Sequence, residues 1–320
     1  MKICVCIYDR CRSITNIMLT DLLNDPEVSA EYVIRYPYPR MRIMEKVVKA
    51  VYRIGWHFRK WHLAHTLQWS GVDLLVVTNE AMLGFSKKDL RNLKKVQNIK
   101  LAALLIDPIK AKYRTAAIAN ELLPEFDYVL TFDPKDAEEF GFIYTNQLYS
   151  SVDMHSTRLE KDLFYIGNIK NRSKLLNALA NLAQENRVKV EILLTGNVDD
   201  ELKSKAGVSA LKKSIPYKEM LKMMQQCRCI LDITQEMQSG ITLRYYEAVV
   251  YNKKLLSNNP NIKSLPFYND RYMKIYHQIE DIDWKWICNG DMPNYCYHDE
   301  FSSKHLKSLL EKTVSIQAES

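Results

Sequence analysis

A glycine, an arginine and a glutamate in the second half of the chain have the types and spacing of an anion-binding helix end. Gly240 precedes a helical pattern that starts at Thr242, Arg244 lies in its first turn, and Glu247 follows one helical step later on the same face. The first amides of a helix are unpaired and its N-terminal end is positive, so such an end attracts anions. A cation for phosphate and a carboxylate for ribose hydroxyls together suit a nucleoside diphosphate.

The elements around this helix predict a parallel sheet. Apolar runs at 162–168, 188–194, 229–233 and 254–258 alternate with helical patterns at 175–182, 217–227 and 242–251. Ligands of such sheets bind beyond the carboxyl ends of the strands. Polar residues and glycines fall at those ends, and they are the candidate ligand-binding residues: Gly167, Asn168, Gly196, Asn197, Tyr217, Gln238, Ser239, Gly240, Ile241 and Thr242.

This order of features resembles the donor-binding half of glycosyltransferases of the GT-B fold, in their bacterial capsule and lipopolysaccharide branch. The resemblance spans roughly residues 160–260 and implies a nucleotide-sugar donor. It implies that Glu247 binds the ribose and that residues 215–217 flank the nucleobase. It also implies that Arg172 or Lys170 faces the phosphates, and that Gly167 opens the first loop.

The chain departs from the commonest GT-B pattern at one position. That pattern has an acidic residue eight positions before the ribose-binding glutamate, where this chain has Ser239. The carboxylate that contacts the sugar therefore has no clear counterpart. The alternative interpretation of the segment is an ordinary βαβ unit, in which Gly240 is a turn and Arg244 and Glu247 form a weakly stabilising surface pair.

The first half of the chain predicts a second doubly wound unit. Strands are expected at 2–8, 32–35, 72–78, 99–106 and 128–132, and helices at 13–24, 41–68, 112–122 and 135–140. The expected fold class is therefore α/β, with two Rossmann-like domains facing across a cleft in the GT-B architecture.

The domain boundaries follow from a polar stretch without strand or helix pattern between Tyr149 and Glu160. We expect an acceptor-binding domain at 1–152 and a nucleotide-sugar-binding domain at 161–301. The resemblance implies that the terminal helix, within 302–320, packs back onto the first domain.

The net charge of +7 is concentrated in one segment. Residues 35–60 contain eight arginines and lysines against Glu45 alone, interleaved with aromatic residues. Such a helix indicates a surface that binds anionic lipid, and we assign this role to residues 35–62. The alternatives are a solvated face of a helix whose apolar stripe faces the core, and a nucleic-acid-binding surface. The nucleic-acid-binding surface is disfavoured because no helix-turn-helix or RNA-recognition signature accompanies the charge.

The general base should come from the first domain. Glu80 and Asp107 follow predicted strands and are the two leading candidates. Asp9 and His155 are further candidates of lower rank. A retaining enzyme would need no protein base, so this choice stays open. No metal or cofactor is expected, because Asp281 and Asp283, the only Asp-x-Asp pair, come too late for the metal site of the GT-A fold and are interpreted as surface charge.

The composition also bears on where in the cell the protein is found. No window is long and apolar enough to span a membrane, no secretory leader is seen, and seven cysteines lack zinc-finger spacing. These features predict a cytoplasmic protein, with residues 35–62 holding it at the inner face of the plasma membrane.

The sequence thus predicts a metal-independent glycosyltransferase that uses a nucleotide-diphosphate sugar and a glycan or lipid-linked acceptor in surface polysaccharide synthesis. The alternative is a catalytically inactive GT-B-like scaffold subunit of a glycan assembly complex, which Ser239 supports.

Overall fold

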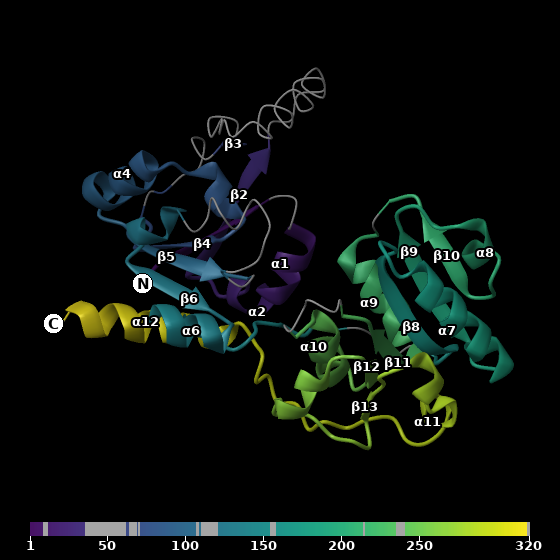
Figure 1. The fold of residues 1–320 in the computed structure, drawn as a ribbon. Helices are drawn as coiled ribbons and strands as arrows, with labels where there is room; N and C mark the ends of the chain where they lie inside the picture. Colours follow the sequence, from purple (N-terminus) through teal and green to yellow (C-terminus); the bar gives the residue numbers. More distant parts are fainter. Residues whose placement is uncertain are drawn as a thin grey trace, which may run out of the picture. The chain divides into compact units, whose positions relative to one another are not determined.

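The structure is a computed structural model, and it describes residues 1–8, 12–35, 62–63, 69, 71–106, 109, 121–153, 158–213, 215–234 and 241–318. The chain divides into two compact units (Figure 1). Unit 1 comprises Met1–Val152 together with Phe301–Ser320, and unit 2 comprises Asp153–Glu300.

Unit 1 is built on a seven-stranded sheet in the order β3-β2-β1-β4-β5-β6-β7. Its strands are β1 (Ile3–Tyr8), β2 (Val28–Arg35), β3 (His62–Leu63), β4 (Leu74–Thr78), β5 (Lys100–Leu105), β6 (Tyr128–Thr131) and β7 (Ile143–Tyr144). All pairings are parallel except that of β3 with β2. The order outward from β1 is that of a doubly wound sheet.

The short edge strand β3 corrects one prediction. His62 and Leu63 were expected in the helix 41–68, but they pair with Arg35 and Ile34 of β2. Helical periodicity is a local signal, and here the backbone partners available at the sheet edge outweigh it. Residues 36–61, the rest of the basic segment that was expected to bind lipid, lie outside the described residues.

Helices cover both faces of the unit 1 sheet. They are α1 (Arg12–Met18), α2 (Thr20–Leu23), α4 (Lys87–Gln97), α6 (Pro134–Phe140), α12 (Lys304–Ala318) and the 3-10 turns η4 (Ala81–Gly84) and η5 (Leu123–Glu125). Ile3, Val5 and Ile7 of β1 pack in one cluster with residues of α2 and α12, whereas Cys4 and Cys6 pack on the other face with η4 and α4. The alternation of the strand produces these two layers.

The return of the chain to unit 1 is fixed by buried serines. The hydroxyls of Ser150 and Ser303 are 2.9 Å apart, and Ser303 Oγ also accepts from the backbone N–H of Leu22 at 3.0 Å. Ser302 Oγ donates to Asp21 at 2.6 Å. These bonds anchor the start of α12, whose Leu306 and Leu310 then enter the unit 1 core.

Unit 2 is built on a parallel six-stranded sheet in the order β10-β9-β8-β11-β12-β13. Its strands are β8 (Lys161–Asn168), β9 (Val190–Thr195), β10 (Val208–Leu211), β11 (Cys227–Asp232), β12 (Lys254–Ser257) and β13 (Met273–Ile275). The chain adds strands on one side of β8 and then returns to add β11 on the other. The topological switch point, where ligands of such sheets bind, is therefore between β8 and β11.

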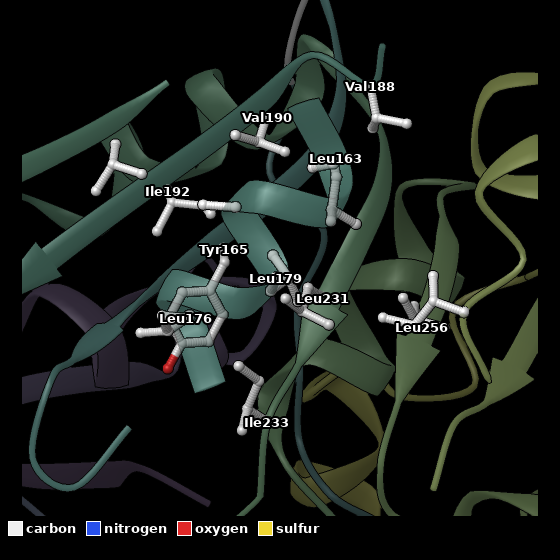
Figure 2. Packing of buried hydrophobic residues seen from close by; sticks show 14 of the residues in the cluster. Leu163, Tyr165, Leu176, Leu179, Val188, Val190, Ile192, Leu231, Ile233 and Leu256 are labelled. Carbon is white, nitrogen blue, oxygen red and sulfur yellow. The ribbon is translucent and has the colours of Figure 1, made fainter. Parts of the chain in front are cut away.

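The helices of unit 2 are α7 (Ser173–Glu185), α8 (Asp200–Lys203), α9 (Tyr217–Gln225), α10 (Leu243–Val250) and α11 (Trp284–Cys288), with the 3-10 turns η6 (Pro260–Ser264) and η7 (Ile279–Asp281). Figure 2 shows the core beneath α7, where Leu163 of β8 and Leu231 of β11 meet Leu176 and Leu179. On the opposite face, α9 contacts β11 and α10 contacts both β11 and β12. Because α10 lies against these strands, its first turn is held near their carboxyl ends.

Membrane-spanning helices and metal-binding clusters can be assessed only within the described residues. Among them, no helix is long and apolar enough to cross a membrane. Within the same ranges, no group of three or more histidine, cysteine or acidic side chains could hold a metal ion. Asp281 and Asp283 are exposed and accept from the backbone N–H groups of Gln278 and Trp286, each at 3.0 Å, as ordinary turn and helix caps.

We expect Gly207→Ala to destabilise unit 2 by about 2–4 kcal/mol. Gly207 has φ +77°, and a Cβ there would lie 2.2 Å from the carbonyl oxygen of Val190. Gly290→Ala is the matched control, because Gly290 has φ +80° but its Cβ would come no closer than 3.9 Å to Lys254 Nζ. The control should show only the backbone cost, about 1–2 kcal/mol. Denaturant unfolding of both variants measures the difference, and equal losses would contradict the clash.

Candidate functional site

The first turn of α10 is tied to the carboxyl end of β11. Thr242 caps the helix with extended backbone, and its Oγ1 accepts from the N–H of Arg244 at 3.2 Å. The same hydroxyl donates to Asp232 Oδ1 at 2.9 Å. One threonine therefore fixes both the start of the helix and its position against the sheet.

Arg244 and Glu247 form a buried ion pair on α10. Glu247 is wholly buried and only 19% of the Arg244 side chain is exposed. The guanidinium of Arg244 donates to Glu247 Oε2, and the hydroxyl of Tyr217, the first residue of α9, donates to Oε1. The alternative interpretation of these residues as a surface pair is wrong. Burial, the largest single contribution, lowers the pKa of Arg244, but the charge and hydrogen bond of Glu247 together with Tyr217 and Asp232 raise that pKa above its ordinary value.

A second buried carboxylate, Asp232, closes β11. It is 4% exposed and accepts from Ser257 Oγ at 2.8 Å as well as from Thr242. Burial raises the pKa of Asp232, although these hydrogen bonds and the nearby Arg244 and Arg172 lower it. Sequence reasoning missed this residue. The signal was present, because Asp232 stands at the end of an apolar strand where the other strands carry polar residues.

Arg172 lies at the switch point between β8 and β11. Its guanidinium donates to the carbonyl oxygens of Asn168 at 3.3 Å and Ile233 at 3.1 Å, which bridges the two strand ends. Asn168 in turn donates to Thr195 Oγ1 at 3.3 Å and accepts from the N–H of Lys170 at 3.1 Å. These bonds bring the ends of β8, β9 and β11 together, with a cation among them. Arginine has five donors, so a phosphate role for Arg172 stays a prediction.

Gly167 and Gly196 are required for two different physical reasons. Gly196, in the turn after β9, has φ +101°, a backbone conformation that residues with a side chain rarely adopt. Gly167 leaves space for its neighbour, because a Cβ there would lie 2.6 Å from the hydroxyl oxygen of Tyr165. Figure 2 shows the Tyr165 ring beside Leu176. Asn197 is exposed and Ile241 is partly buried.

Tyr276 is a further residue that sequence reasoning missed. It follows β13, is 3% exposed, and its hydroxyl has no hydrogen-bond partner among the described residues. Burial raises the pKa of Tyr276. The charge of Asp232 raises this pKa further, whereas the charge of Arg172 lowers it. No sequence signal distinguished it from the other eighteen tyrosines of the chain.

The remaining predicted residues are only partly placed. Glu80 lies two residues after Thr78, the carboxyl end of β4, directly precedes η4 and is partly exposed. Its neighbour Asn79 is buried and accepts from the N–H of Ile106 at 3.3 Å, which joins the ends of β4 and β5. Asp107, Gln238, Ser239 and Gly240 lie outside the described residues, as do Asp9 and His155.

Comparison with known proteins identifies the fold. No model of a known protein family matches the chain, and no curated protein matches it in sequence. Solved structures do match over nearly the whole chain. The structure of the glycotransferase of kitacinnamycin has a TM-score of 0.52 at 11% identity, covering 97% of this chain and 98% of its own. Anabaena Alr3699/HepE, in complex with UDP and glucose, has a TM-score of 0.53 at 12% identity, with 98% and 99% covered. A UDP-N-acetylglucosamine 2-epimerase has a TM-score of 0.56 at 10% identity, with 99% and 97% covered.

The chain has the GT-B fold. The prediction of an α/β protein with two doubly wound, Rossmann-like domains is confirmed, and so is the resemblance to GT-B glycosyltransferases at the level of the fold. This GT-B chain shares its fold with a UDP-N-acetylglucosamine 2-epimerase as well. At these identities the likeness establishes the fold alone.

We expect Asp232→Asn to stabilise the GT-B chain increasingly as the pH rises above about 4. Burial raises the pKa of Asp232 in the folded state, so folding favours the neutral carboxyl. The stability that this group contributes is complete below its unfolded pKa of about 3.9 and is lost as the pH rises through the folded pKa. The amide stays neutral and still accepts from Thr242. Thermal melts of parent and variant between pH 4 and 8 measure the difference, and a constant difference would contradict the raised pKa.

Proposed function

We propose that this protein is a glycosyltransferase that moves a sugar from a nucleotide-diphosphate donor to a glycan or lipid-linked acceptor in surface polysaccharide synthesis, without a metal. The observation that carries the proposal is the buried Arg244–Glu247 pair in the first half of α10, a helix that Thr242 ties to the switch-point edge of the sheet. The GT-B fold supports it, as do neighbours with that fold that are described with UDP or as a glycotransferase.

The proposed donor chemistry uses the charges at this edge. The leaving diphosphate gains negative charge as the sugar departs, and preorganised donors aimed at that charge lower the barrier. The positive N-terminal end of α10, with Arg244 and Arg172, would supply them. Glu247 would accept from the ribose hydroxyls and residues 215–217 would flank the base. Gly196, Asn197 and the segment from Gln238 to Thr242 would complete the donor site.

The acceptor half of the proposal uses unit 1. Glu80 or Asp107 would take the proton from the acceptor hydroxyl, and residues 35–62 would bind the anionic inner face of the plasma membrane, where lipid-linked acceptors lie. A cytoplasmic protein at that face would meet both donor and acceptor. The capsule or lipopolysaccharide pathway is part of the proposal and rests on the sequence resemblance.

Two other functions remain candidates. An epimerase that acts on a nucleotide-sugar is favoured by the 2-epimerase of the same fold. A catalytically inactive scaffold subunit is favoured by Ser239, which stands where an acidic residue is common. Incubation with UDP-N-acetylglucosamine separates them, because an epimerase yields an epimeric sugar and a scaffold leaves the donor intact. A glycosyltransferase releases UDP in the presence of an acceptor.

We expect one of UDP, GDP, ADP and CDP to raise the melting temperature of the parent protein. Saturation at about 100 times the dissociation constant adds about 2.7 kcal/mol to the stability of the folded state. Glu247→Gln should abolish most of this stabilisation, because the neutral amide is a weaker acceptor for ribose hydroxyls and no longer balances Arg244.

The matched control is Glu191→Gln, which changes a glutamate on β9 that pairs with Lys161 at the opposite end of the strand from Thr195. It should melt near the parent and keep the full nucleotide shift. If no nucleotide stabilises the parent, or if Glu247→Gln keeps the whole shift, the proposed donor site is wrong.

We expect either Glu80→Gln or Asp107→Asn to reduce the rate of sugar transfer by about 10²–10⁴-fold, the usual contribution of a general base. The nucleotide affinity of both variants should equal that of the parent, since each residue belongs to unit 1. Release of nucleoside diphosphate from the preferred nucleotide-sugar measures the rate. If both variants keep the parent rate, neither residue is the base.

A further inference from the structure

The hydroxyl of Tyr276 is buried, and it has no hydrogen-bond partner among the described residues. Tyr276 directly follows β13, and only 3% of it is exposed. An unpaired buried hydroxyl is costly, and phenylalanine would bury the same ring without that cost. Buried polar groups in folded proteins are almost always paired, so an unpaired one requires an explanation. The surroundings of Tyr276 indicate what its hydroxyl pairs with.

The backbone fixes Tyr276 at the carboxyl edge of the unit 2 sheet. Its N–H donates to the carbonyl oxygen of Ser257, the last residue of β12, at 3.1 Å. Ser257 Oγ donates in turn to Asp232 at the end of β11, at 2.8 Å. The ring of Tyr276 packs in the apolar cluster that also contains Tyr165 and Ile233, both labelled in Figure 2. Tyr276 therefore lies at the strand ends that carry the candidate site.

The charges of Arg172 and Asp232 both act on the Tyr276 hydroxyl. Burial raises the pKa of Tyr276, Asp232 raises it further, and Arg172 lowers it. Burial also raises the pKa of Tyr165, which Arg172 lowers and Asp232 raises. Both phenols are thus influenced by the cation that bridges the ends of β8 and β11. An anion bound by Arg172 would come near a hydroxyl that is able to donate to it.

We propose that Tyr276 is a further ligand-binding residue, whose hydroxyl donates a hydrogen bond to a phosphate oxygen of the nucleotide that Arg172 binds. This inference rests on the proposed function, which places the diphosphate beside Arg172. A phosphate oxygen is charged, so this hydrogen bond is stronger than one between neutral groups. Binding gives the hydroxyl the partner that the described part of the protein does not supply. Because the hydroxyl is covered, the side chains over it shift as the phosphate enters.

The first test is the nucleotide affinity of Tyr276→Phe, which keeps the ring and removes the hydroxyl. We expect the preferred nucleotide among UDP, GDP, ADP and CDP to bind this variant about tenfold more weakly than the parent, the value of one hydrogen bond to a charged group. Titration calorimetry measures the change. An affinity equal to that of the parent would mean that the hydroxyl meets only water, and would overturn the proposal.

The melting temperature of Tyr276→Phe without nucleotide is the second part of this test. The variant should melt no lower than the parent, because it loses a group that is unpaired before the ligand binds. A melting temperature well below that of the parent would show that the hydroxyl is already paired within the protein. That result would overturn the proposal, whatever the nucleotide affinity.

The matched control is Tyr128→Phe. Tyr128 is also 3% exposed, and its hydroxyl likewise has no partner within the described ranges. It is the first residue of β6 in unit 1, at the opposite end of the strand from the edge where ligands of parallel sheets bind. This variant should melt no lower than the parent and keep the full nucleotide affinity. A tenfold loss in Tyr128→Phe as well would show a general effect of removing a buried hydroxyl, and would overturn the specific role of Tyr276.

A phosphorus NMR spectrum of the bound nucleotide identifies the group that the hydroxyl contacts. At saturating nucleotide, we expect at least one phosphorus resonance to differ between Tyr276→Phe and the parent, and none to differ between Tyr128→Phe and the parent. Weakened binding with unchanged phosphorus resonances would place the hydroxyl against the nucleoside instead, and would overturn the phosphate contact.

The failure of this inference and the failure of the proposed function give different results. If the parent binds a nucleotide and Tyr276→Phe binds it equally well, the role of Tyr276 is wrong and the donor site stands. If no nucleotide binds the parent or either variant, the proposed function is refuted, and the role of Tyr276 with it.

Discussion

Two buried carboxylates organise the carboxyl edge of the second sheet. A buried charge is costly unless it is paired and hydrogen-bonded, so Asp232 and Glu247 both require donors from the elements around them. Asp232 draws Thr242 and Ser257 to the end of β11, and Glu247 draws Arg244 and Tyr217 together. The start of α10, the start of α9 and two strand ends are thereby held at one place.

The strand order explains why these residues, far apart in sequence, are available to one another. In a parallel sheet every strand delivers its carboxyl end to the same edge, and the order β10-β9-β8-β11-β12-β13 makes β8 and β11 neighbours. Arg172 follows β8, and its guanidinium reaches the carbonyl oxygen of Ile233 after β11. Because the crossover connections make β8 and β11 neighbours, Arg172 in the loop after β8 can bridge the ends of both strands.

The elements with strong periodicity could be predicted from the sequence, whereas several of the short edge strands could not. The strand at 162–168 and the helix around 242–251 were found within a few residues, because long apolar runs and helical spacing are local properties. The strands β7, β10 and β13 have two to four residues and were missed. They exist because a neighbouring strand offers backbone partners, and a single sequence does not show that. His62 and Leu63 were placed in a helix for the same reason.

The candidate site divides in the same way. Arg244 and Glu247 were recognisable because their spacing puts them on one helical face, but the sequence left a surface pair open as an alternative. Burial decided the matter, since Glu247 is wholly buried and accepts a hydrogen bond from Tyr217, which lies 30 positions earlier in the chain. Asp232 and Tyr276 were missed because their importance comes from what packs around them, not from neighbours in the sequence. A wholly buried acid that is hydrogen-bonded on both oxygens adds little to the stability of the fold, since a well-packed apolar residue there is often as stabilising or more so. Glu247 instead ties α10 to the start of α9 through Tyr217, and it holds Arg244 near the end of the helix that attracts anions.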